Sequence, residues 1–387
     1  MATIFENGVI YTPQEIVQDG MVIVAESGRI SYVGSRQEAP PTQNLRIDLQ
    51  GRILAPGLID IHVHGGYGVS FGNVDLAGNL LKYAQWVRTK GVTGFLLSIA
   101  APDADRLEQM TGGYAQILSG FTESAEALGL HLEGPFLNQE KKGAFNPAWL
   151  RQPDVEETKR LLQAGQGWVK QMTLAPENQG ALEVAALLRN AGVVAALGHS
   201  NTSYELAVEA LQGDFTHVTH TFNAQSGFDH RVPGVLGAIL TSDTVTAELI
   251  ADTVHVHPGA MKVLIRCLGV ERIVAITDAM AGAGFPDDSY DLAGHEAIVK
   301  DGRATLTNGT LAGGIATLDQ CVKNLHHQAG VPLHQAVQMA SLNPARVIGE
   351  DGRIGSIAAG KNANLIIMDE DVNIYLTMVK GRIVYQQ

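Results

Sequence analysis

The sequence has little of what a disulfide-bonded, membrane-spanning or secreted protein requires. Only two cysteines, Cys267 and Cys321, occur in 387 residues, so a disulfide framework is excluded, and two buried free thiols in a reducing cytoplasm are expected. No uncharged apolar run is long enough to cross a bilayer. The first residues lack a charged segment ahead of an apolar core, so we expect no signal peptide and a cytoplasmic location.

Positive charge is also scarce. Lys and Arg number 27 against 40 Asp and Glu, which gives a formal net charge of −13. This balance disfavours nucleic acids and anionic membranes as partners, although a local basic pocket could still take an anionic substrate. What is abundant is apolar residues, at 45%, and glycine, at 43 residues, which suit a sizeable core with many tight turns.

A rhythm of strand, loop and helix fills the middle of the chain and predicts a (β/α)8 TIM-like barrel, an α/β fold. The eight predicted strands are Ile53–His64, Thr93–Ile99, Leu128–Gly134, Val169–Pro176, Val193–His199, Thr216–Phe222, Val245–Ala251 and Ile273–Asp278. The predicted helices are Leu76–Lys90, Ala104–Leu118, Val155–Ala164, Ala181–Ala191, Tyr204–Leu211, Pro258–Leu268, Thr317–Ala329 and Leu333–Ala340. Barrels of this kind place their chemistry at the C-terminal ends of the strands.

Both chain ends consist of short β-runs. Met21–Ala25 and Arg29–Gly34 flank a turn and predict a hairpin, and three further runs follow Asn364. Chain ends commonly lie close together, so we expect the two ends to form one small β-sandwich module. The predicted domains are therefore residues 1–52 plus 347–387 for the module and 53–346 for the barrel.

The most informative motif is Asp60-Ile61-His62-Val63-His64-Gly65, directly after a buried run. Side chains two apart on a strand share a face, so His62 and His64 are predicted to project together and could chelate one metal ion. His-x-His alone is a weak signal, because two histidines fall in a β-run by chance. Similar residues at other strand ends strengthen it.

Polar residues recur where the other predicted strands end: Glu133 on the third, His199 on the fifth, His220 on the sixth and Asp278 on the eighth. Taken singly, each could be a surface histidine or a helix cap. Converging on one barrel mouth, they predict a site for zinc, iron or another divalent transition ion. Such a site activates water for attack on a carbonyl carbon, with Asp278 placed to take the proton.

Two further histidines are predicted to be structural. His131 lies deeper than Glu133 on the same face and is expected to form buried hydrogen bonds. His217 is expected on the opposite strand face from His220.

The order of these residues resembles the amidohydrolase superfamily and, within it, the N-acetylglucosamine-6-phosphate deacetylase family. The resemblance covers nearly the whole chain. The stretches that carry it include Pro56–Gly66, Gly129–Phe136, Lys141–Gly143, Thr173–Glu177, Gly198–Ser200, Thr219–His220, Phe222–Ala224, Thr277–Ala279 and Ala340–Ala345.

The resemblance implies a role for each matching residue. It implies metal ligation by Glu133, His199 and His220, with His62 and His64 making one or two ions per subunit possible, and Asp278 as the catalytic acid/base. His255 matches a histidine that contacts the substrate and polarises the acetyl carbonyl. The residues that match phosphate-binding positions are Asn223, Ala224 and Arg231. The resemblance also implies a homodimer in which the arginine can reach the partner's phosphosugar.

The chain departs from the family pattern at Phe145, where histidine is common. The implied reaction removes acetate from N-acetylglucosamine 6-phosphate, but N-acetylgalactosamine 6-phosphate or a non-phosphorylated amide stays open as the substrate. A barrel retained as a non-enzymatic scaffold is the third hypothesis, and the complete set of predicted ligands disfavours it.

Overall fold

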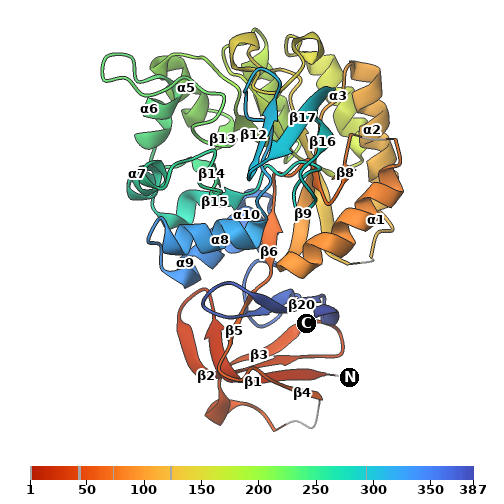
Figure 1. Ribbon diagram of the computed structural model, residues 1–387, viewed down its shortest axis with the longest axis vertical. Helices are drawn as coiled ribbons and strands as arrows, with labels where there is room; N and C mark the ends of the chain where they lie inside the picture. The colour runs from red at the N-terminus through yellow and green to blue at the C-terminus, as the bar shows by residue number, and fades with distance from the viewer. Residues whose placement is uncertain (1, 42–44, 73, 123, 293) are drawn as a thin grey trace.

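The computed structural model describes residues 2–41, 45–72, 74–122, 124–292 and 294–387. It has a barrel of parallel strands and helices above a smaller sheet made from both ends of the chain (Figure 1). Among the described helices, none combines the length and apolar character needed to cross a membrane.

Eight parallel strands form the barrel in the order β15-β14-β13-β12-β11-β10-β9-β6, which confirms the predicted fold. Their bounds are β6 Leu58–Asp60, β9 Val92–Ile99, β10 Glu126–Glu133, β11 Val169–Leu174, β12 Val194–Leu197, β13 Phe215–Val218, β14 Thr246–Ile250 and β15 Ile273–Ile276. A parallel bridge between Val63 and Ala279 closes the seam just beyond β6 and β15. Buried Asp60 reinforces it by accepting a hydrogen bond from the Thr277 hydroxyl at 2.6 Å.

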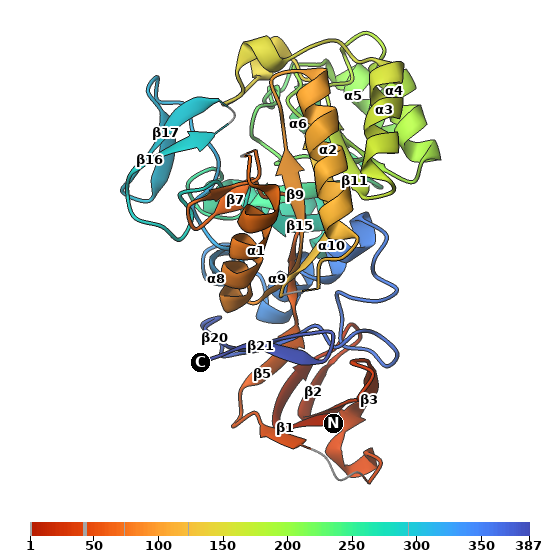
Figure 2. The same ribbon diagram turned by 90° about the vertical axis from the view of Figure 1, so that its right-hand side faces the viewer.

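Helices surround the strands (Figure 2). Their bounds are α1 Leu76–Val87, α2 Ala104–Leu118, α3 Val155–Gly165, α4 Ala181–Asn190, α5 Tyr204–Gln212, α6 Gly234–Leu240, α7 Pro258–Leu268, α8 Leu318–His327, α9 Leu333–Met339 and α10 Leu342–Val347. Short 3-10 segments occupy Arg36–Glu38, Arg88–Lys90, Gln139–Lys141, Pro147–Trp149 and Val270–Arg272. Side chains of Asp103, Asp154 and Ser203 cap α2, α3 and α5, as the preference for short polar N-caps leads one to expect. Two helices were not predicted from the sequence, α6 and α10, which have seven and six residues.

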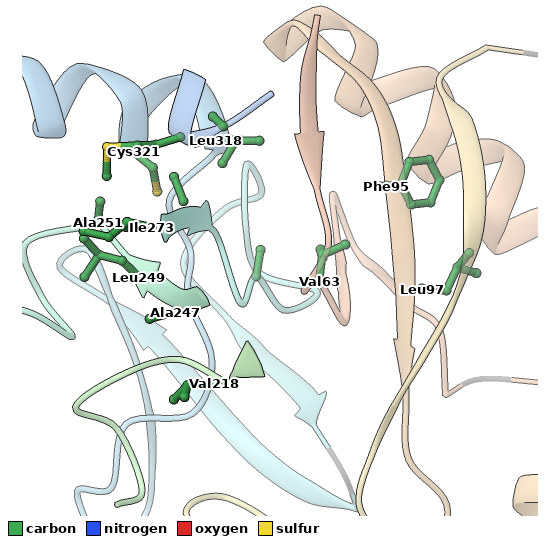
Figure 3. Close-up of a cluster of buried hydrophobic side chains, with 14 of the residues drawn as sticks. Val63, Phe95, Leu97, Val218, Ala247, Leu249, Ala251, Ile273, Leu318 and Cys321 are labelled. Atoms are coloured by element: carbon green, nitrogen blue, oxygen red, sulfur yellow. The ribbon is translucent and has the colours of Figure 1, made fainter. Parts of the chain in front are cut away.

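The barrel core joins side chains from strands far apart in the sequence. Phe95 and Leu97 of β9, Val218 of β13 and Ile273 of β15 belong to one buried cluster, and Cys321 of α8 packs into it (Figure 3). The prediction of two buried thiols is therefore right for Cys321 and wrong for Cys267, which is exposed on α7.

The terminal strands form one hydrogen-bonded sheet, in which strands from both chain ends surround a shared apolar core. The strands are β1 Thr3–Tyr11, β2 Ile16–Val24, β3 Ile30–Ser35, β4 Leu45–Asp48, β5 Ile53–Pro56, β19 Leu365–Met368, β20 Ile374–Val379 and β21 Arg382–Gln386. The predicted strand Ile53–His64 is divided: β5 pairs with β1 and β19 of this sheet, and β6 continues into the barrel.

A small three-stranded sheet, which the sequence analysis did not anticipate, follows β15 (Figure 2). It consists of β16 Ser289–Leu292, β17 His295–Lys300 and β18 Arg303–Leu306, and its inner face packs on Met280. A two-residue ladder of β7 Gly65–Gly66 and β8 Val69–Ser70 lies in the loop after β6.

Asn343 anchors the start of β15. Its buried amide nitrogen donates to the carbonyl oxygens of Val270 and Ile273, each at 2.7 Å. We expect Asn343→Ala to lower the free energy of unfolding by about 1–3 kcal/mol, because one buried and one partly buried carbonyl group lose their donor. Urea denaturation measures this, with Asn190→Ala at an exposed helix end as the control. Equal midpoints for the two variants would contradict it.

Candidate metal centre

His62 and His64 lie immediately beyond β6, and both side chains turn to the C-terminal rim of the barrel. His62 is fully buried, and its Nε2 lies 3.4 Å from Glu133 Oε1 and 3.5 Å from Asp278 Oδ1. His64 Nε2 lies 2.9 Å from Glu133 Oε2 and 3.4 Å from Asp278 Oδ1. Both imidazoles therefore reach the same pair of carboxylates, although His62 lies in a bend beyond β6 and not in the predicted strand.

Glu133, the last residue of β10, is the hub of the site. Besides its contacts with His62 and His64, its Oε1 lies 3.2 Å from His199 Nε2 and 3.1 Å from His220 Nε2. The two imidazole nitrogens are 3.0 Å apart. One carboxylate is thus shared by histidines that follow three different strands.

His199 is held with its Nε2 facing this hub. Its Nδ1 donates to the carbonyl oxygen of Lys141 at 2.7 Å, so the Nε2 lone pair is directed at Glu133 and His220. A backbone acceptor on the outer ring nitrogen is the usual way in which a metal-binding histidine is oriented.

Three of these residues adopt a left-handed backbone, which non-glycine residues rarely do: His199 has φ 47°, His220 φ 25° and Asp278 φ 49°. Each stands just after the end of its strand, where the chain turns and the side chain is redirected to the barrel axis. Strain of this kind costs about 1–3 kcal/mol per residue and concentrates at functional sites.

The donors fall into two groups whose ligand atoms lie within 4.8 Å of one another. The groups are His62, His64 and Asp278, and Glu133, His199 and His220. Buried His62 Nε2 has no hydrogen-bond partner among the described residues, as a ligand atom without its ion would. Neutral imidazole and carboxylate are the donor set of zinc and other divalent transition ions, so these residues fit a metal.

The electrostatics of the cluster agree with this assignment. Burial opposes charge on His64, but the hydrogen bonds that His64 donates to Asp278 and Glu133 outweigh it and raise the pKa of His64 to about 9. Burial also opposes ionisation of Asp278, yet the charge of His62 and the hydrogen bond from His64 hold the pKa of Asp278 below its usual value. Positive charge at the rim therefore stabilises the carboxylates, and a bound cation would supply it.

His255 stands beside this cluster, in the loop after β14. Its Nδ1 lies 2.7 Å from Asp252 Oδ2, and the other oxygen of Asp252 accepts from the backbone N–H groups of Val254 and His255. Burial lowers the pKa of His255, but the bond to Asp252 outweighs burial and raises it. Asp252 therefore fixes the orientation of the imidazole and favours its protonated form, which carries a hydrogen on the far nitrogen as well.

A cavity of about 330 Å³ lies over the cluster. His64, Glu133, His199, His220 and Asp278 line its floor, together with the predicted substrate residues Asn223, Ala224 and His255. Asp291 and Leu292 of β16 line it from the small sheet. Arg231 is not among the described residues that line it and lies exposed between β13 and α6.

Phe145 forms part of the cavity wall next to a metal-site histidine. Its ring is 7% exposed and meets the His199 ring edge-on, with the centroids 5.2 Å apart. The wall at this point is apolar and offers no hydrogen bond to a ligand.

Beneath the rim lie functional groups that the sequence analysis missed. Glu248, in the middle of β14, contacts His62 and His220, and it is held from below by Gln171 and His217. The expectation that His217 lies on the opposite strand face from an inward-pointing His220 is wrong, since the buried His217 ring also points into the barrel, with its Nε2 3.3 Å from Glu248 Oε1. A charged residue between Ala247 and Leu249, in a strand whose interior should be apolar, was the available signal.

His131 is structural, as expected. Its two ring nitrogens bond the hydroxyls of Ser98 and Thr173, at 2.9 and 2.8 Å, which leaves neither free for a metal.

A closed parallel barrel whose rim gathers two histidine–carboxylate groups under a cavity defines a class, the barrel hydrolases that use metal ions. The family model described as "Amidohydrolase family" matches residues 53–384. The chain belongs to the amidohydrolase family.

Individual proteins within this family are similar to the chain over most of its length. The chain is 36% identical over 368 residues to an N-acetylglucosamine-6-phosphate deacetylase of Vibrio furnissii, covering 95% of this chain and 91% of that protein. It is 36% identical over 332 residues to an N-acetylgalactosamine-6-phosphate deacetylase of Escherichia coli O157:H7, covering 86% and 87%. A Mycobacterium smegmatis N-acetylglucosamine-6-phosphate deacetylase, solved as an alanine-for-aspartate mutant with N-acetyl-D-glucosamine-6-phosphate, matches with a TM-score of 0.91 and 34% identity, covering 100% and 99%.

Removal of the shared carboxylate should abolish metal binding. Wild-type protein treated with a chelator and then given Zn²⁺ at 100 times its dissociation constant should gain about 2.7 kcal/mol in free energy of unfolding. Glu133→Gln should show no such gain. Glu157→Gln, which removes a buried carboxylate paired with Arg151, should keep it. A metal-dependent gain in Glu133→Gln would contradict the site.

Substitution of Asp252 tests the electrostatics of His255. In Asp252→Asn the anionic partner is lost, so the pKa of His255 should fall toward or below its ordinary value. Because a raised histidine pKa stabilises the fold below the unfolded-state value and loses this effect as pH rises through the folded-state value, the variant should also be less stable at acidic pH. Titration of the histidine Cε1–H signals by NMR measures the shift, and an unchanged His255 signal would contradict it.

Proposed function

We propose that this chain hydrolyses N-acetylglucosamine 6-phosphate to glucosamine 6-phosphate and acetate, with one or two zinc or iron ions per subunit. The observation that carries this proposal is the pair of neighbouring donor groups at the floor of a cavity that His255, Asn223 and Ala224 also line. The names of the relatives supply the substrate.

When bound, a divalent cation at these donors supplies Lewis-acid activation of water and of the amide carbonyl. Asp278 is the proton carrier. Its pKa is held below the usual range, so it is a carboxylate at neutral pH and can accept the proton of the attacking water. It then returns that proton to the departing amine nitrogen, so that the C–N bond breaks and acetate and the free amino sugar leave.

His255 and the loop after β13 orient the substrate. With Nδ1 fixed by Asp252, the opposite nitrogen of His255 can donate to the acetyl carbonyl oxygen as negative charge develops there. Asn223 and Ala224 stand three and four residues after His220 and line the same cavity, where we propose that they bind the phosphosugar.

We also propose a cytoplasmic homodimer in which Arg231 reaches the phosphate in the partner's cavity. Arg231 is exposed on its own subunit, and the loop around it displays two large apolar side chains, Phe228 at 58% and Val232 at 68% exposure. Exposed apolar side chains clustered beside a cation suit a subunit interface.

The test is acetate release by the purified protein from N-acetylglucosamine 6-phosphate, N-acetylgalactosamine 6-phosphate and unphosphorylated N-acetylglucosamine, each with and without chelator. We expect the first substrate to have the highest kcat/KM and activity to require metal. A higher kcat/KM for N-acetylgalactosamine 6-phosphate would instead support the activity for which the Escherichia coli O157:H7 relative is named. Phe145 would then be the first residue to examine.

In the same assay Asp278→Asn should lower kcat by about 10²–10⁴, the usual contribution of a general acid–base group. Asp301→Asn, in an exposed hairpin turn, is the matched control and should retain wild-type kcat. Metal-independent activity, or an Asp278→Asn variant with wild-type kcat, would overturn the proposed function.

A further inference from the structure

Glu248 is a fully buried carboxylate at the centre of the barrel, beneath the rim. It stands on β14, and its neighbours along the strand, Ala247 and Leu249, are buried in the apolar core. A charged residue at such a position is stable only if its environment satisfies it completely.

Four hydrogen-bond donors converge on this carboxylate. Oε2 receives His62 Nδ1 at 2.8 Å and the backbone N–H of His220 at 3.0 Å. Oε1 receives Gln171 Nε2 at 2.9 Å and lies 3.3 Å from His217 Nε2. Two of the four partners are therefore residues of the candidate metal centre, one from each donor group.

The bond to Nδ1 determines what His62 presents to the rim. With the Nδ1 hydrogen directed at Glu248, the Nε2 lone pair points toward Glu133 and Asp278, and no described residue satisfies it. The carboxylate fixes the tautomer and the plane of the ring, and it makes Nε2 a stronger donor to a cation.

The bond to the His220 backbone acts on the other donor group. His220 has a left-handed φ of 25°, an unfavourable conformation for this residue type. An acceptor fixed beneath its N–H helps to hold the turn that directs the imidazole at Glu133.

We propose that Glu248 is a positioning residue of the metal centre, holding His62 for the group formed by His62, His64 and Asp278 and steadying the turn that carries His220. This inference rests on the proposed function, since it assumes that these donors bind metal.

The arrangement of the four donors around position 248 requires a carboxylate. All four partners donate, so an amide at position 248 must turn its own N–H₂ group toward two of them. Glu248→Gln conserves size and shape but cannot satisfy both sides. If the N–H₂ group faces the rim, the donors of His62 and His220 lose their acceptor. If it faces inward, the donors of Gln171 and His217 lose theirs.

The experiment compares wild type, Glu248→Gln and Asn343→Ala. Asn343→Ala removes a buried amide elsewhere in the barrel, without contact with the metal donors, and controls for lost stability. For each protein, metal content is counted after equilibration with Zn²⁺, affinity is measured by competition with a chelator, and unfolding is followed in the metal-free form.

We expect Glu248→Gln to lose about 10–100-fold in Zn²⁺ affinity, the range usual for such partners of metal ligands. Asn343→Ala should keep wild-type affinity even where its metal-free form is equally destabilised. In a His62→Ala background, Glu248→Gln should cost less Zn²⁺ affinity than it costs in wild type, because the part of its effect that acts through His62 is already lost and only the part that acts through His220 remains.

Wild-type affinity in Glu248→Gln, with wild type itself binding metal, would overturn this inference and leave the proposed function intact. Absence of metal binding in wild type would instead overturn the proposed function. If Glu248→Gln does not fold, Glu248→Asp keeps the charge and withdraws it from His62, and the same measurement decides: weaker Zn²⁺ binding supports the role and unchanged binding refutes it.

Discussion

A single carboxylate oxygen, Oε1 of Glu133, lies within 3.4 Å of three imidazole nitrogens, and the organisation of this barrel depends on that convergence. The histidines come from positions after β6, β12 and β13, so they meet only because parallel strands close into a cylinder with all C-terminal ends on one rim. Nothing in the local sequence brings them together. The barrel provides the geometry, and the short turns after each strand direct the side chains inward.

Holding these groups together is energetically unfavourable without a cation, and the surrounding structure compensates in two ways. Left-handed turns at His199, His220 and Asp278 are tolerated because the strands before them are fixed in a rigid sheet. Partners below and beside the rim, Glu248 and the carbonyl oxygen of Lys141, fix the outer nitrogens of the histidines. The site therefore consists of the donors that face the rim and of the partners that orient them.

The rim could be predicted from sequence because its logic needs no knowledge of which strands pair. Residues at the ends of parallel strands share one edge in any barrel, so His62 and Asp278 could be placed together from opposite ends of the domain. Glu248 could not be, since an isolated charge inside a strand becomes meaningful only when its partners on other strands are known. The division of Ile53–His64 into β5 and β6 was hidden for a related reason: the chain from Ile53 to Ile59 has no polar side chain, and both sheets bury it. The sheet from β16 to β18 lies outside the barrel rhythm, and strand alternation there was too short to recognise.

The terminal sheet has a consequence for the order in which the molecule can be assembled. β5 lies between β1 and β19, and its Pro56 pairs with Leu365 almost at the other end of the chain. During synthesis the early strands must wait, with an open hydrogen-bonding edge, until nearly all of the barrel has been made. Completion of that sheet then joins the two ends of the polypeptide beneath a barrel whose own seam also unites its first and last strands. A nascent chain interrupted before β19 would therefore leave one edge of β5 unpaired, and unpaired strand edges promote aggregation. In the complete protein β19 covers this edge.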